Sequence, residues 1–501
     1  MNRALTRLSL AVLVMFGLLL INVNYVQAFQ AGSLATKPAN GRTFEQQFHY
    51  QRGSIIAAGG NSNVTIAESR PAKGSTSTST STGSTTYTRY YPFGSVYAPI
   101  TGFDSVYGST GIEEAYNKYL SGTASNLAVH NLVSLLTGKP KQGANVLLTV
   151  SAKAQQAAYQ GLQNDGGHQA GVVALDPTTG AILAMASTPT FNPNKFTTLN
   201  GTKFDQIDKA YLSDPAQPLL NRAINETYPP GSSFKVITGS AGFSSGKYAG
   251  PTATIAAPQP LTLPNGNQLN NDGGEQCGDG HPQILEAFYL SCNTAFANIG
   301  MKVGGPTLQQ YATKFGWNDS TLTIPMPVSA SVVPRVTDKS FTALSSIGQF
   351  DDQATPLQEA MDAAAIANNG TLMRPYLLQS VQAPDLTTLA KTQPSVLSQA
   401  VSSQVAGDMQ QMMIAVTQNP AGTAYQTAGP PTVGTLVIAG KTGTAENGLT
   451  NTATDDAVFT CFAPASDPKI AVGVIVKGGG FGADAAAPIA VKIIEAYLGV
   501  K

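Results

Sequence analysis

The hydrophobic pattern begins with an uncharged, mostly apolar run over residues 8–26. Its length is close to the roughly 20 residues that a helix needs to cross a bilayer. Arg3 and Arg7 precede the run, and positive charge favours the cytoplasmic side, so the rest of the chain is expected outside. We therefore predict that residues 1–28 form a cytoplasmic tip and a transmembrane anchor of a single-pass plasma-membrane protein. A cleaved signal peptide is the alternative, because Val26-Gln27-Ala28 resembles a small-x-small cleavage site.

Apolar runs of strand length stand at both ends of the region that follows residue 145. A β-hairpin is predicted where residues 171–176 and 181–186 flank the turn residues Pro177-Thr178-Thr179-Gly180. We expect this hairpin to share one antiparallel sheet with strands from the end of the chain. Those strands are predicted at 436–441, 457–463 and 470–477, and a closing helix is predicted at 488–498.

The segment between the hairpin and the late strands is richer in patterns of helical period, of which residues 356–368 are the clearest example. Strands at both ends and helices between them predict an α+β domain over residues 145–501. A sheet-bearing part then meets a helical part, and clefts form at such junctions.

Residues 29–144 are less regular. Residues 74–88 are almost entirely serine, threonine and glycine, a composition that buries too little apolar surface to pack, so an exposed flexible loop is predicted there. Order is expected to return near Tyr90, and residues 111–116 have a helical pattern.

Length and composition fit two folded units, because 501 residues exceed one typical domain and 42% hydrophobic residues suffice for a substantial core. The 29 basic residues balance the 29 acidic ones and form no long run, so nucleic acid is not expected as a partner. The four histidines lack metal-ligand spacing. We therefore predict no metal and no cofactor.

The three cysteines do not make a disulfide framework. Cys277 and Cys292 are close enough in sequence for one bridge, which would constrain the unfolded chain by roughly 3 kcal/mol. A bridge and two free thiols are both open on this evidence. Cys461 lies in a strand-like apolar run and is expected to be a buried packing residue.

Candidate chemistry is concentrated in Tyr228-Pro229-Pro230-Gly231-Ser232-Ser233-Phe234-Lys235. The prolines and the glycine oppose helix up to Gly231, so Ser232 is expected at a helix N-terminus. Lys235 follows one turn later on the same face, near unpaired N–H groups and the positive end of the helix dipole. A hydroxyl and an amine placed in this way are suited to nucleophilic catalysis, although Ser-x-x-Lys alone is common by chance.

Two later motifs give the first one its meaning. Ser291-Cys292-Asn293 lies downstream, and Lys441-Thr442-Gly443-Thr444 follows an apolar run. The ordered set Ser-x-x-Lys, Ser-x-Asn and Lys-Thr-Gly is the signature of penicillin-recognising acyl transferases. In this respect the chain resembles the class B penicillin-binding proteins.

Further segments extend the resemblance. Gln51-Arg52-Gly53-Ser54-Ile55-Ile56 is similar to the element that opens their non-catalytic pedestal domain, and residues 187–194 are similar to the segment after their hairpin. Residues 97–103 and 221–228 look most like the penicillin-binding protein A group of high-GC Gram-positive bacteria. The resemblance implies a pedestal or dimerisation-type domain over 29–144 and a penicillin-binding transpeptidase domain over 145–501, with an antiparallel five-stranded sheet flanked by helices.

The resemblance also implies an activity. The donor would be the D-Ala-D-Ala end of a peptidoglycan stem peptide, D-Ala would leave, and an amine of a second stem would resolve the acyl-enzyme into a crosslink. β-Lactams would bind covalently, and the partners would include proteins of a division or elongation complex.

Each motif residue has an expected role in that reaction. Ser232 would attack, and Lys235 would take its proton, which requires the pKa of Lys235 to fall by roughly 3 units. Ser291 would pass a proton to the leaving nitrogen, and Asn293 would orient Lys235 and the substrate. The remaining residues, Lys441, Thr442, Gly443 and Thr444, would bind the substrate carboxylate, with the N–H groups of Ser232 and Thr444 as an oxyanion hole.

Other readings of the sequence are weaker. Gly242-Phe243-Ser244-Ser245-Gly246 fits a hydrolase nucleophile elbow but lacks the strand that must precede one. Thr435 stands where a phosphate loop ending at Thr442 needs its first glycine. The chain lacks the glutamate motif that a β-lactamase uses for deacylation, so a β-lactamase is not favoured. A D,D-carboxypeptidase differs only in using water to resolve the same intermediate and remains open, as does a catalytically silent scaffold.

Overall fold

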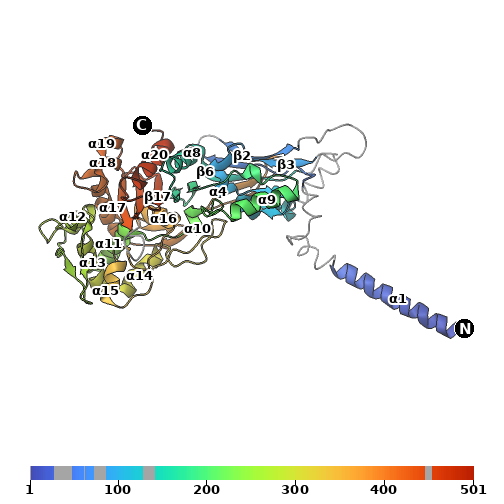
Figure 1. Ribbon diagram of the computed structural model, residues 1–501, viewed down its shortest axis with the longest axis horizontal. Helices are drawn as coiled ribbons and strands as arrows, with labels where there is room; N and C mark the ends of the chain where they lie inside the picture. The colour runs from blue at the N-terminus through green and yellow to red at the C-terminus, as the bar shows by residue number, and fades with distance from the viewer. Residues whose placement is uncertain are drawn as a thin grey trace.

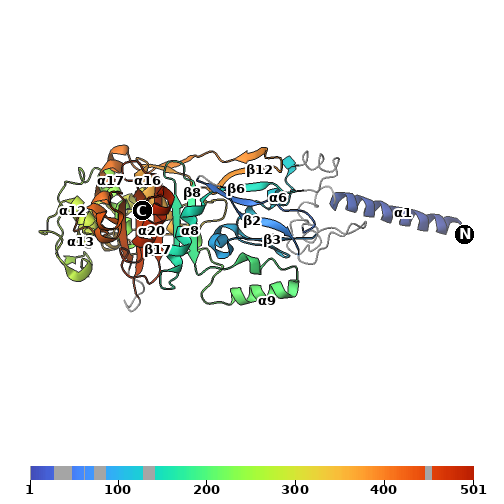
Figure 2. The same cartoon turned by 90° about the horizontal axis from the view of Figure 1, so that it is seen from above.

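The computed structural model describes residues 2–26, 48–60, 63–72, 86–127, 142–445 and 454–500. Two sheets organise the folded part. The five-stranded sheet stands between a helical part with α12 and α13 at one end of the molecule and a six-stranded sheet toward the other (Figures 1 and 2). Of the predicted Ser/Thr/Gly-rich loop, residues 74–85 lie outside the described residues.

The five-stranded sheet confirms the predicted union of the early hairpin with the late strands. Its strand order is β15-β16-β17-β7-β8, and every neighbouring pair is antiparallel. Strand β15 begins at Ala439, not at Leu436, and ends at Ala445. The Lys-Thr-Gly-Thr motif therefore lies inside this strand. The strands are β7 (Ala170–Leu175), β8 (Ile182–Thr188), β15 (Ala439–Ala445), β16 (Asp456–Ala463) and β17 (Ile470–Val476).

Helices cover this sheet. Helix α16 (Pro356–Ala367) packs on β17, β7 and β16, and all of its residues are buried. Gly473 of β17 allows this close packing, because a Cβ there would lie 2.4 Å from the backbone nitrogen of Ala360. Helices α8 (Ala152–Gln163) and α20 (Ala486–Leu498) pack on each other and on β8, β16 and β17.

The helical part surrounds α11 (Lys235–Ser244), which contacts α13, α14 and α17. Ser244 of the possible nucleophile elbow lies in this helix, so the elbow interpretation is wrong. The longer helices of this part are α12 (Ile284–Tyr289), α13 (Asn293–Val303), α14 (Gly305–Lys314), α15 (Lys339–Ser345) and α17 (Ser403–Gln418). Shorter or peripheral elements are α9 (Gly201–Leu212), α10 (Arg222–Asn225), α18 (Tyr425–Ala428), α19 (Pro430–Val433), β9 (Leu261–Thr262), β10 (Gln268–Leu269), β11 (Thr371–Met373) and β14 (Val396–Gln399).

The six-stranded sheet has the order β13-β12-β6-β1-β2-β3. Only β1 and β6 pair in parallel. Strands β12 and β13 come from far along the chain, so this sheet ties the N-terminal region to the later one (Figure 2). Its strands are β1 (Ile55–Gly59), β2 (Val64–Pro71), β3 (Tyr87–Tyr90), β6 (Asn145–Ser151), β12 (Leu378–Gln382) and β13 (Thr388–Lys391). Beside it lie α4 (Ala98–Thr101), α5 (Gly111–Ala115), α6 (Asn117–Leu120), β4 (Asp104–Ser105) and β5 (Gly108–Ser109).

The predicted membrane anchor is wrong. Residues Asn2–Tyr25 form helix α1, yet within the described ranges no helix combines the length and the apolar character needed to span a bilayer. Arg7 precedes the apolar run, and Asn22 and Asn24 lie within it before its predicted end. The prediction of a single-pass location in the plasma membrane depended on this helix and is therefore wrong as well.

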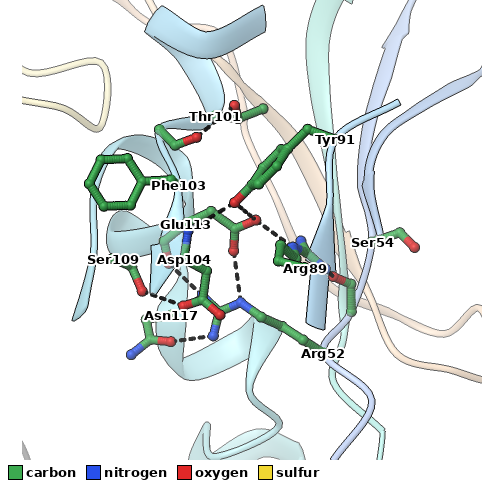
Figure 3. Close-up of polar contacts among 12 residues, drawn as sticks. Arg52, Ser54, Arg89, Tyr91, Thr101, Phe103, Asp104, Ser109, Glu113 and Asn117 are labelled. Atoms are coloured by element: carbon green, nitrogen blue, oxygen red, sulfur yellow. Dashed lines mark hydrogen bonds and ion pairs between the residues drawn. The ribbon is translucent and has the colours of Figure 1, made fainter. Parts of the chain in front are cut away.

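A buried ion-pair network holds the N-terminal region together (Figure 3). The carboxylate of Glu113 on α5 accepts hydrogen bonds from Arg52 Nε at 2.7 Å, from Arg89 Nε on β3 at 2.5 Å and from the Tyr91 hydroxyl at 3.2 Å. Burial alone would raise the pKa of Glu113, but the charges of Arg89 and Arg52 outweigh it and lower that pKa. Glu113 thus joins α5 to β3 and to Arg52, which comes from the segment resembling the opening of a pedestal domain.

Loss of the Glu113 carboxylate is expected to destabilise this region strongly. Glu113→Ala leaves two arginines buried without their shared counter-charge, which costs about 3–5 kcal/mol. The matched control is Glu68→Ala, because Glu68 pairs with Arg70 on the surface and such pairs contribute about 0–1 kcal/mol. Urea unfolding measures both. Equal losses in the two variants would contradict the structural role assigned to the network.

Candidate active site

The Ser-x-x-Lys motif begins in a tight turn. Residues Gly231–Phe234 form a 3-10 turn, η5, and the α-helix starts only at Lys235. The prediction placed Ser232 at the helix N-terminus, but Ser232 lies in this turn, three residues before the α-helix begins, and the spacing still places it beside Lys235. Gly231 has a φ of 56°, and a Cβ there would lie 2.6 Å from the carbonyl oxygen of Thr444, so the turn packs directly on β15.

The Lys235 amine lies at the centre of the site. Its Nζ is 2.8 Å from Ser232 Oγ, 2.7 Å from the Ser291 carbonyl oxygen and 2.7 Å from Asn293 Oδ1. The carbonyl and amide oxygens can only accept hydrogen bonds. A neutral amine has two N–H groups, so it can serve both of these acceptors and still offer its lone pair to the Ser232 hydroxyl. The geometry therefore suits a neutral Lys235 that receives a proton from Ser232.

Ser291 connects the two lysines. Its backbone adopts a left-handed φ of 61°, unusual for a residue other than glycine, and its carbonyl accepts from Lys235. Its hydroxyl oxygen lies 2.8 Å from Lys441 Nζ and 3.3 Å from Lys235 Nζ. The next residue, Cys292, forms a disulfide with Cys277, whereas Cys461 is free and buried. Ser291 is thus placed to carry a proton between the two amines.

Strand β15 forms the opposite wall as an edge strand of the sheet. Lys441 Nζ also donates to the Thr442 carbonyl at 2.9 Å, and Thr442 Oγ1 lies 2.7 Å from Thr423 Oγ1. The Thr444 carbonyl accepts from Gln349 Nε2 at 3.1 Å and so points away from β16. In an antiparallel strand the N–H of a residue points to the same side as its carbonyl, so the Thr444 N–H faces the site.

Burial explains the protonation of both lysines. It lowers the pKa of Lys441 to about 7, because no carboxylate compensates the buried charge. It also lowers the pKa of Lys235 well below its ordinary value, and the neighbouring charge of Lys441 lowers it further. Two adjacent buried amines do not both keep a proton, so we assign the neutral form to Lys235, whose pKa is lowered by both effects.

A cleft with a volume of about 760 Å³ opens over these residues. The predicted residues Ser232, Ser291, Asn293, Thr442 and Thr444 line it, while Lys235 and Lys441 are fully buried behind its wall and Gly443 is buried within the strand. The structure thus brings all three motifs together. The cleft is also lined by Asp272, Thr423, Asp455 and Phe481. The sequence did not point to these residues, because they stand singly and carry no motif or periodicity.

The arrangement supplies what acyl transfer requires. It contains a hydroxyl beside a neutral amine, a second hydroxyl that leads to a buried cation, and an edge strand with hydroxyls and an inward N–H. Such a site can form and break an ester with an acyl donor that carries a carboxylate.

Comparisons with known proteins agree with this geometry. Residues 170–495 match the family model of the penicillin binding protein transpeptidase domain, and residues 52–146 match that of the penicillin binding protein A dimerisation domain. The peptidoglycan D,D-transpeptidase PbpA of Mycolicibacterium smegmatis is 40% identical over 509 residues, which cover 99% of each chain. Its counterpart in Mycobacterium tuberculosis is 38% identical with the same coverage.

Solved structures agree as well. The penicillin G acyl-enzyme complex of penicillin-binding protein A from M. tuberculosis aligns with a TM-score of 0.81 and 38% identity, covering 90% of this chain and 100% of that one. Its imipenem acyl-enzyme complex aligns with a TM-score of 0.82 and 39% identity, covering 91% and 100%. With the fold, the three assembled motifs and these matches in agreement, the chain belongs to the penicillin-binding protein transpeptidase family.

Proposed function

We propose that this protein is a peptidoglycan D,D-transpeptidase that works through an acyl-enzyme on Ser232. The observation that carries the proposal is the environment of Lys235, whose two acceptors leave its lone pair for the Ser232 hydroxyl. Relatives named as peptidoglycan D,D-transpeptidases and acyl-enzyme complexes of a homologous structure with β-lactams support the same reaction.

Acylation proceeds in two steps, nucleophilic attack and then cleavage of the peptide bond. Ser232 Oγ attacks the carbonyl carbon of the penultimate D-Ala while its proton moves to Lys235 Nζ. The N–H groups of Ser232 and Thr444 stabilise the oxyanion, a kind of interaction worth about 3 kcal/mol per donor in other enzymes. The peptide bond then breaks, a proton passes through Ser291 to the leaving nitrogen, and D-Ala departs.

Lys441, Thr442 and Thr444 bind the carboxylate of the terminal D-Ala, and Gly443 keeps the strand close to the nucleophile turn. Asn293 holds the Lys235 amine in place through its side-chain oxygen. In the second half of the reaction an amine of a neighbouring stem peptide attacks the Ser232 ester. The new peptide bond forms as the ester bond breaks, and the proton of the amine returns to Ser232 through Lys235.

The domain division proposed for this activity places a pedestal at residues 29–144 and the transpeptidase domain at 145–501. Strands β6, β12 and β13 from the second domain join β1, β2 and β3 of the first in one sheet, which would fix the position of the pedestal relative to the catalytic part. Proteins of a division or elongation complex are the partners that we propose for the pedestal.

Ser232→Ala is expected to abolish covalent labelling by a fluorescent penicillin, because the ester cannot form without the hydroxyl. The matched control is Ser244→Ala, which removes a serine from the same helical segment at the possible elbow. Gel fluorescence after incubation measures both variants. Labelling that survives in Ser232→Ala, or disappears only in Ser244→Ala, would refute the assignment of the nucleophile.

Transpeptidation is separated from hydrolysis by its products. A pentapeptide donor incubated with an amine acceptor is expected to yield free D-Ala together with a donor–acceptor adduct, measured by mass spectrometry. With the acceptor omitted, release of D-Ala should slow, since the ester then waits for water. Release of D-Ala at the same rate with no adduct in either condition would identify a carboxypeptidase instead.

The rate constant of penicillin acylation is expected to rise with pH as Lys235 loses its proton, with a midpoint well below the ordinary lysine pKa of 10.5. Lys441→Gln should move this rise to higher pH, because removing a neighbouring cation raises the pKa of Lys235. Lys302→Gln, an exposed lysine on α13, is the control and should leave the midpoint unchanged. A midpoint that stays fixed or moves to lower pH in Lys441→Gln would contradict the coupling.

A further inference from the structure

A buried carboxyl group lies directly behind the nucleophile turn. Glu359 on α16 is 1% exposed, and its Oε1 lies 2.9 Å from the hydroxyl oxygen of Ser233, the residue after the proposed nucleophile. Its Oε2 is buried and has no hydrogen-bond partner in the described part of the chain. The proposed mechanism makes no use of this carboxyl group.

Counting protons at Ser233 determines the protonation of Glu359. Ser233 Oγ also lies 2.8 Å from the Pro230 carbonyl oxygen, which can only accept. The hydroxyl has a single proton, so it cannot donate to both Pro230 and an ionised Glu359. A protonated Glu359 resolves the conflict: its O–H donates to Ser233, and Ser233 donates to Pro230. The neutral form also avoids leaving a charged oxygen buried without a partner at Oε2.

Within the described ranges no basic side chain forms an ion pair with Glu359. Asp362, one turn later on α16, is a second buried acid, and it accepts from Trp317 Nε1 and Gln358 Nε2. Burial raises the pKa of Glu359 to about 8, opposed by the Ser233 hydrogen bond, and burial and Glu359 raise that of Asp362. Glu359 is therefore mainly neutral near pH 7, and the pKa of Asp362 is shifted in the same direction. The titratable or charged residues on the elements packed against α16 and η5 are Arg222, which pairs with Glu226, and Lys235, Asp408, Lys441, Asp456 and Cys461.

Glu359 also links the turn that carries Ser232 to strand β16 of the five-stranded sheet. Its backbone carbonyl accepts from Thr460 Oγ1 on β16, and Thr460 is the register partner of Lys441 on β15. Its side chain reaches Ser233 in η5, which packs on β15. One residue of a fully buried helix therefore contacts both the turn that carries Ser232 and the strand beside Lys441.

We propose that Glu359 is a positioning residue that retains its proton and, through the chain Glu359 to Ser233 to Pro230, holds the turn that presents Ser232. It rests on the proposed role of Ser232, but it assigns no bond-making step to the carboxyl group. Ionisation of Glu359 makes it compete with Pro230 for the single Ser233 proton, so the turn loses one of its two anchors.

The decisive variant is Glu359→Gln, because the amide donates to Ser233 at every pH. The rate constant of acylation by a fluorescent penicillin is measured for wild type and variant from about pH 6 to 10, and their ratio is taken, since Lys235 and Lys441 titrate in both. The rate constant of wild type divided by that of Glu359→Gln should be near one at low pH. It should fall about tenfold as pH rises, the effect of one lost hydrogen bond, with a midpoint near pH 8. A ratio that does not change with pH would overturn the proposal.

Two further variants separate positioning from packing. Asp362→Asn alters the other buried acid of α16, which does not contact the turn, and its ratio to wild type should stay flat across the same pH range. Ser233→Ala removes the relay and should lower acylation about tenfold near pH 7. In that background Glu359→Gln should have no further effect on the pH profile. A pH-dependent ratio for Asp362→Asn, or a persisting Glu359 effect without Ser233, would contradict the relay.

Thermal unfolding tests the retained proton without any turnover. The pKa of Glu359 is raised in the folded state, so its contribution to stability is complete below its ordinary value of 4.5 and falls until about 8. The melting temperature of wild type should therefore drop relative to Glu359→Gln between these pH values and then run parallel to it. A constant difference would show that folded Glu359 is ionised. This measurement does not depend on the role of Ser232. If Ser232→Ala still bound penicillin covalently, the proposed function would fail, and the melting temperatures would still test whether Glu359 retains its proton.

Discussion

The active site depends on one buried lysine, Lys235, that forms no salt bridge with any described carboxylate. An amine in water keeps its proton at neutral pH, and a base is needed to take the proton of Ser232. Burial behind the cleft and the proximity of Lys441 shift the balance toward the neutral form, and two oxygen acceptors fix the direction of the lone pair. A carboxylate in contact with Lys235 would restore the charge and remove the base. The absence of a salt bridge to Lys235 among the described residues is therefore a functional requirement.

That requirement places demands on the fold. The three motifs come from a turn, a helix junction and an edge strand that are far apart in sequence, and they must meet within hydrogen-bond distance. The close approach of α16 to β17 at Gly473 and of the Gly231 turn to β15 makes this possible. Burial without a counter-charge favours the neutral form of an ionisable group. By this reasoning Glu359 and Lys235 follow the same rule on opposite sides of the nucleophile turn.

The sequence predicted the parts of this molecule that depend on local patterns. Apolar runs of strand length identified the hairpin and the late strands, and motif order identified Ser232, Lys235, Ser291, Asn293 and Lys441 before any geometry was known. It did not predict the 3-10 turn at Ser232, because a short turn and the first turn of an α-helix have the same residue preferences. It also missed Glu359 and Thr423, whose importance comes only from contacts with residues distant in sequence. The anchor prediction, made from the length and lack of charge of residues 8–26, is wrong, because within the described residues no helix has the length and apolar character needed to span a bilayer.

The two regions of the chain use buried charge in opposite ways. In the N-terminal network Glu113 keeps its charge, because two arginines lower its pKa, and the resulting ion pairs tie α5 to β3 and to the segment that carries Arg52. In the catalytic region Lys235 and Glu359 lack such partners, so burial shifts each toward its neutral form. Paired charges have fixed protonation and suit a structural joint. Buried groups without an ion-pair partner shift toward their neutral form and suit a site that must move a proton, so the placement of counter-charges separates the supporting part of this protein from the reactive one.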